Sequence, residues 1–134
     1  MEINAICLTA DQQLGLIREA QNLISSRSGN CITFQEYTSG QIDYLEITKV
    51  GSGCGSTVGR AGGVQYLSLA EECFLAGYGI IAHEMMHVLG FLHEHVREDR
   101  NSYIIVHEEL IAPGIISLLA MKSLTHVNNY LIQW

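Results

Sequence analysis

Three histidines that could bind one metal ion lie within eleven residues of each other, in the segment HEMMHVLGFLH (83–93). His83 and His87 are four residues apart, so on a helix they project from the same face, one above the other. Two imidazoles placed in this way can hold one cation at about 2.0–2.1 Å each. Gly90 can adopt a left-handed backbone that turns the chain sharply. We expect this turn to bring His93 back as a third nitrogen ligand.

Glu84 stands directly beside the first of these histidines in the sequence. Three protein ligands and one open position for water are typical of a catalytic zinc site. The metal lowers the pKa of its water to about 7 and polarises a bound carbonyl. A neighbouring glutamate can act as the general base and later give the proton to the leaving amine. The pattern therefore predicts one zinc ion per chain, Glu84 as the catalytic residue, and hydrolysis of peptide bonds.

A structural role is the alternative for a lone H-E-x-x-H pattern, because buried helical histidines can simply pair with a glutamate. Here a glycine follows the second histidine by three residues, and His93 follows that glycine by three more. The longer pattern is the signature of the metzincin metallopeptidases. It favours the metal site over the structural alternative.

Hydrophobic spacing predicts the elements that must position this site. Residues 77–90 read as a helix that Gly90 ends, and its apolar stripe comprises Ile81, Met85, Val88 and Leu89. A capping box of Thr9 and Gln12 predicts a second amphipathic helix over residues 10–26. Strands are expected over 31–37, 43–50 and 64–69, a flexible glycine-rich connection over 51–63, and a short extended stretch over 102–107.

Composition fits one folded domain, since 48% of the 134 residues are hydrophobic and 16% are charged. A formal net charge of −7 disfavours nucleic acid as a partner, because phosphate binding needs clustered Lys and Arg. No apolar stretch reaches the roughly 20 residues of a membrane helix. The first ten residues lack the positive charge and the apolar core of a signal peptide.

Four cysteines, Cys7, Cys31, Cys54 and Cys73, allow three complete pairings. None of them has the short spacing of a cysteine zinc site. Disulfides are the better interpretation, and they imply an oxidising compartment.

The segment HEMMHVLGFLHEHVREDRNSY resembles the astacin family of zinc proteases, whose extended pattern is HExxHxxGFxHExxRxDRxxY. GSGCGSTVGR with QYLSL resembles the loop and strand that precede the zinc helix in that family, and NCITF resembles the strand entry after its first helix. The resemblance covers about residues 10–112. The residues that match the pattern beyond the three histidines are Glu94, Arg97, Asp99, Arg100 and Tyr103.

The resemblance implies that His83, His87 and His93 bind zinc, that Glu84 is the base, and that Cys54 and Cys73 form a disulfide. It also implies that Glu94 receives the ammonium of a processed amino terminus. For the acidic and basic residues at 94–100, a solvated charged cluster with weak ion pairs and a structural network around the site are equal alternatives. His95, His107 and His126 have no place in the pattern, and we expect them to be surface histidines.

The sequence departs from the family after about residue 113. Family members continue into a second lobe with a methionine turn of the type SxMHY, and we find no such motif. Cys31 matches a family cysteine whose partner lies in that lobe, so it is expected to be unpaired or paired with Cys7. We expect a truncated form of a secreted parent protein, with residues 1–134 as a single incomplete peptidase domain and 113–134 as a divergent tail.

These observations predict an α+β fold, in which a small mixed sheet of three or more strands is backed by two helices, as in the amino-terminal lobe of a metzincin. The expected function is a zinc-dependent metalloendopeptidase acting on polypeptides. The alternative is a zinc-binding, non-catalytic interaction module that lacks the second lobe.

Overall fold

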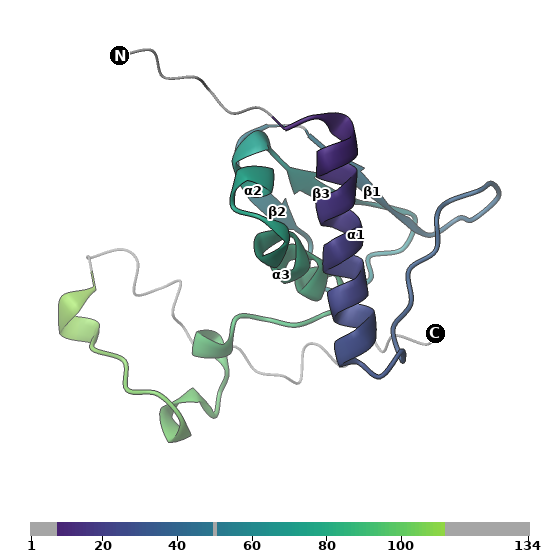
Figure 1. Cartoon of the computed structure of the whole chain (residues 1–134). Coiled ribbons are helices and arrows are strands. Elements are labelled where there is room, and N and C mark those ends of the chain that lie inside the picture. The colour runs from purple at the N-terminus through teal and green to yellow at the C-terminus, as the bar shows by residue number, and fades with distance from the viewer. Residues whose placement is uncertain (1–7, 50, 112–134) are drawn as a thin grey trace, which may run out of the picture.

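The computed structural model describes residues 8–49 and 51–111, which form a small mixed sheet with helices packed against it (Figure 1). The expected α+β fold is confirmed. Strands β1 (Tyr44–Thr48) and β3 (Val64–Leu69) pair in parallel, and β2 (Cys54–Ser56) pairs antiparallel with the other edge of β3. Helices α1 (Ala10–Arg27) and α3 (Tyr78–Val88) pack against each other.

Helix α1 begins at the predicted capping box. The backbone amide of Gln12 donates to the Thr9 hydroxyl, and the Gln12 side chain accepts from the Thr9 amide, so two otherwise unpaired amides are satisfied. Ala20 and Ile24 are buried on the face toward α3. The helix ends one residue later than predicted, before Gly29, whose φ of 64° lies in the left-handed region.

The prediction of a strand over 31–37 was wrong, since these residues join no ladder within the described part of the chain. Ile32 and Phe34 are half-buried and pack against the core, whereas Thr33 and Gln35 are exposed. This alternation produced the strand pattern in the sequence. It reflects an extended segment that packs through its side chains and has no strand partner for its backbone.

The glycine-rich segment is more ordered than the sequence suggested, because β2 lies inside the range predicted to be a flexible connection. Cys54 pairs with Leu69 in the ladder, and its sulfur is bonded to Cys73 on the short helix α2 (Glu71–Leu75). Neither β2 nor α2 was predicted. Both depend on contacts that are distant in the sequence.

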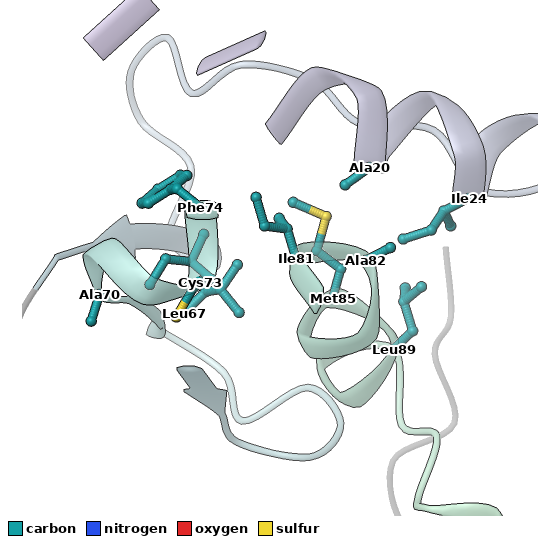
Figure 2. Packing of buried hydrophobic residues seen from close by; sticks show 11 residues of the cluster. Ala20, Ile24, Leu67, Ala70, Cys73, Phe74, Ile81, Ala82, Met85 and Leu89 are labelled. Atoms are coloured by element: carbon teal, nitrogen blue, oxygen red, sulfur yellow. The ribbon is translucent and has the colours of Figure 1, made fainter. Parts of the chain in front are cut away.

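The core lies between the sheet and the two long helices (Figure 2). Of the apolar stripe predicted on α3, Ile81, Met85 and Leu89 are buried, and Val88 is half-buried against the same cluster. The other elements contribute Ala20, Ile24, Leu67, Leu69, Ala70, Cys73 and Phe74. Packing of α3 on this cluster fixes the helix that carries the histidines.

Beyond Gly90 the described chain forms three short 3-10 turns, η1 (Glu94–Val96), η2 (Arg100–Ser102) and η3 (Glu108–Leu110). The extended stretch predicted at 102–107 forms no strand there. No helix in the described ranges is long and apolar enough to cross a membrane. Cys7, His126 and the tail 113–134 lie outside the described residues.

Candidate metal centre

The three histidines identified in the sequence converge on one point. The Nε2 atom of His93 lies 3.1 Å from Nε2 of His83 and 3.1 Å from Nε2 of His87. One ligand atom from each residue falls within 4.8 Å of the others. Tetrahedral ligands at about 2.05 Å from a zinc ion would be about 3.3 Å apart. The donor set therefore fits a single metal ion.

The end of α3 creates the turn that brings His93 into this set. Gly90 has a φ of 98°, the left-handed backbone expected from the sequence. Its amide donates to the His87 carbonyl at 2.8 Å, and the amide of Phe91 donates to the Met86 carbonyl at 3.0 Å. These two bonds form a Schellman motif, in which the C-terminal carbonyls of the helix are satisfied by the reversing chain.

His87 is further restrained by a contact from its second ring nitrogen. Nδ1 lies 2.7 Å from the carbonyl oxygen of Phe91. Since a carbonyl can only accept, the proton of the neutral ring resides on Nδ1, and Nε2 keeps its lone pair. A hydrogen bond of this kind fixes the tautomer and the ring orientation of a metal-binding histidine.

The electrostatics of the site favour a neutral imidazole at His93. Partial desolvation lowers its pKa most, and repulsion from His87 and His83 lowers it further, while the Glu84 carboxylate acts in the opposite direction. An uncharged ring is the form that binds a metal. Glu84 directly follows His83 on α3.

Glu84 is buried on α3, with 7% of its surface exposed. The hydroxyl of Ser56 donates to its backbone carbonyl at 2.9 Å, which ties the end of β2 to this turn of the helix. Burial next to the histidines is unusual for a carboxylate without a function. The arrangement is compatible with the general base expected from the sequence.

The loop before the metal helix is pinned at two points. Cys54 and Cys73 form a disulfide with their Cα atoms 5.8 Å apart. The Glu72 carboxylate accepts from the Gly53 amide at 2.7 Å. By contrast, the thiol of Cys31 is exposed and free within the described residues.

The charged residues at 94–100 divide into an exposed and a buried part. Arg97 donates twice to Asp99 at 2.9 Å, and it lies 3.5 Å from the exposed Glu94. Arg100 is buried and donates to the His95 carbonyl at 2.7 Å. The solvated cluster therefore describes Glu94, Arg97 and Asp99, and the structural network describes Arg100. Among the described residues Glu94 faces a guanidinium and no ammonium.

His95 was expected to be a surface histidine, and this expectation was incomplete. It is half-buried, and its ring stacks on that of His93 with centroids 5.2 Å apart. The spacing of two residues from a predicted ligand was the only signal in the sequence. His107, in contrast, is exposed and pairs with Glu109 at 2.9 Å.

A sheet-backed helix that presents three converging imidazoles, followed by a tight glycine turn, defines a lobe that can bind one metal ion. The model of the Astacin peptidase family matches residues 8–134. The chain therefore belongs to the astacin family, as its resemblance had indicated.

Individual relatives are consistent with this membership. The chain is 41% identical over 111 residues to zinc metalloproteinase nas-14 of Caenorhabditis elegans, covering 81% of this chain and 21% of that protein. It is 52% identical over 84 residues to the astacin-like metalloendopeptidase of Mus musculus, covering 63% of this chain and 19% of that protein. The chain thus spans about a fifth of the length of these relatives.

The fold also has a solved counterpart. The structure of high choriolytic enzyme 1, a hatching enzyme zinc-protease from Oryzias latipes, superimposes with a TM-score of 0.71 at 32% identity. The superposition covers 87% of this chain and 55% of that one. The nas-14 protein and the hatching enzyme are both zinc proteases by name.

Proposed function

We propose that this chain carries the zinc-binding half of a metalloendopeptidase that hydrolyses polypeptides. The convergence of the three Nε2 atoms of His83, His87 and His93, two of the separations being 3.1 Å, is the observation that supports the proposal. Membership of the astacin family supports it independently.

In this proposal the three histidines hold the zinc ion through Nε2. When bound, zinc supplies Lewis-acid polarisation of the scissile carbonyl and acidification of a water molecule. Glu84 would accept a proton from water onto a carboxylate oxygen and would pass it to the leaving amine. Its burial beside the donor set supports this role, because bulk water competes less for the proton of a group inside the site.

Mass spectrometry of peptide cleavage tests the proposal. The zinc-loaded chain is incubated with a mixed peptide library beside Glu84→Gln, which keeps the shape of the side chain and removes the base. We expect cut products from the wild type, a loss of at least about a hundredfold in the variant, and equal zinc content in both. Folded, zinc-loaded wild type that cuts nothing would contradict the proposal.

A non-catalytic zinc-binding module is the second candidate, and one feature of the surface favours it. An apolar groove of about 420 Å³ runs between α1 and α3 beside His83. Its apolar lining includes Leu23, Ile24, Ile32, Ala82, Met86 and Phe91. Such a surface suits binding. Retention of zinc and of peptide affinity without any cleavage would identify this second function.

We further propose an extracellular location and a single peptidase domain over residues 1–134, with 113–134 as its divergent tail. The disulfide between Cys54 and Cys73 supports the location, since such bonds persist in oxidising compartments. Limited proteolysis of the folded chain would test the domain boundary. Recovery of α1, the sheet and α3 in one resistant fragment is the expected result.

A further inference from the structure

His95 is a fourth imidazole beside the three that converge. Its ring stacks on the ring of His93 at a centroid distance of 5.2 Å and an interplanar angle of 25°. It is not a member of the converging donor set. Its contact with the site is therefore made through the ring face.

His93 needs such a contact more than the other two histidines do. His83 and His87 project from α3, and His87 has an additional bond from Nδ1 to the carbonyl of Phe91. His93 lies outside the helix with an extended backbone, at φ −61° and ψ 135°. In the described part of the chain its Nδ1 has no hydrogen bond. Its ring is stacked on that of His83 at 5.1 Å and on that of His95 at 5.2 Å, and of these two rings His95 is the one outside the donor set.

The backbone of His95 is itself held firmly. Buried Arg100 donates to the His95 carbonyl at 2.7 Å, and the Val96 amide donates to the His93 carbonyl at 3.1 Å. Val96 is only 5% exposed. The charge-assisted bond to the His95 carbonyl and the burial of Val96 thus hold η1 in place. The ring of His95 is presented from a fixed support.

We propose that His95 is a positioning residue, whose ring holds the His93 imidazole with Nε2 toward His83 and His87. The inference rests on the proposed metal site. Aromatic pairs of this geometry contribute enough that losing one should weaken metal binding about two- to tenfold.

Metal affinity of the 134-residue chain tests this proposal without any peptidase assay. The variants are His95→Leu, which removes the ring, His95→Phe, which keeps a ring without nitrogens, and His107→Leu as a control at an exposed histidine. Zinc dissociation constants come from competition with a chelator. The visible absorption of the Co²⁺-loaded protein reports the ligand geometry.

We expect His95→Leu to bind zinc about two- to tenfold more weakly, with an altered Co²⁺ spectrum. His95→Phe should restore both, and His107→Leu should match the wild type. Unchanged affinity and spectrum in His95→Leu would overturn the proposal. An equal loss in His95→Phe would overturn it too, because the nitrogens would then be needed. Absence of zinc binding in the wild type would reject the proposed function itself.

Discussion

The amide of Gly59 donates a 2.8 Å hydrogen bond to the carbonyl of His87, one of the three converging histidines. The glycine-rich segment is thereby attached to the last turn of α3. Behind this bond, the side chain of Gln65 holds the same segment in shape. Its Nε2 donates to the carbonyls of Gly59 at 2.9 Å and Thr57 at 3.3 Å, and its Oε1 accepts from the Ala61 amide at 3.0 Å.

Gln65→Leu should destabilise the chain by about 2 kcal/mol, because it leaves backbone groups of the segment unpaired in a buried place. Gln65 itself is 7% exposed. Urea denaturation measures the free energy of unfolding. Gln41→Leu is the control, since Gln41 is exposed and makes one long contact at 3.4 Å with Thr38. Similar free energies for both variants would contradict this account of the segment.

Gly90→Ala should both destabilise the protein and weaken zinc binding. A non-glycine residue at a φ of 98° costs about 1–2 kcal/mol. Relief of that strain would move His93 away from the other ligands. Gly15→Ala is the matched control, because Gly15 lies inside α1 with open space around it. This substitution should stabilise the protein by about 0.5–1 kcal/mol. If Gly90→Ala stabilised the protein as Gly15→Ala is expected to do, alanine would not strain the turn.

Replacement of Cys54 and Cys73 together by alanine should lower the free energy of unfolding by about 3 kcal/mol. The bond closes a loop with a sequence separation of 19 residues, and its loss frees the unfolded chain. Thermal unfolding with and without reductant provides the measurement. Cys31→Ser should behave as the wild type, since this thiol is exposed and free in the described residues. Insensitivity of the wild type to reductant would refute the prediction.

Asp43 should make the free energy of unfolding depend on pH. A hydrogen bond from the Gly63 amide at 2.6 Å lowers the pKa of its carboxyl most, and a contact with Arg60 lowers it further. A depressed pKa stabilises the fold above the ordinary value of 3.8, and this contribution is lost as the pH falls through the folded-state pKa.

The stability difference between wild type and Asp43→Asn should therefore be largest near neutral pH and shrink below about pH 4. Chemical denaturation at a series of pH values between about 3 and 7 measures it. Arg60→Met should show a smaller effect, because the bond from Gly63 remains. A difference that stays constant across the series would show that Asp43 is not responsible.

The sequence indicated the three converging histidines, because they and the turn between them lie within one short segment, residues 83–93. The cap of α1 and the stripe of α3 were equally local, and both helices were predicted within two residues of their ends. The strand prediction over 31–37 was wrong because half-buried Ile32 and Phe34 alternate with polar residues, although the segment has no strand partner. Strand β2 was missed because its order depends on β3 and on Cys73, which lie far along the chain.

His95 illustrates another limit of local patterns. Apart from its place two residues after His93, nothing in the sequence distinguishes it from His107, yet one stacks on a converging histidine and the other pairs with Glu109 at the surface. The backbone of His95 is in addition held by a bond from Arg100. Only the folded path of residues 94–102 reveals it.

All three converging imidazoles come from one helix and the turn that ends it, between His83 and His93. Closing so short a segment costs little chain entropy compared with sites whose ligands come from distant strands. The donor set is thus local in the sequence. The elements that α3 packs on, α1, β2, β3 and α2, all precede it in the chain, so metal capture during synthesis need not wait for the residues that follow His93.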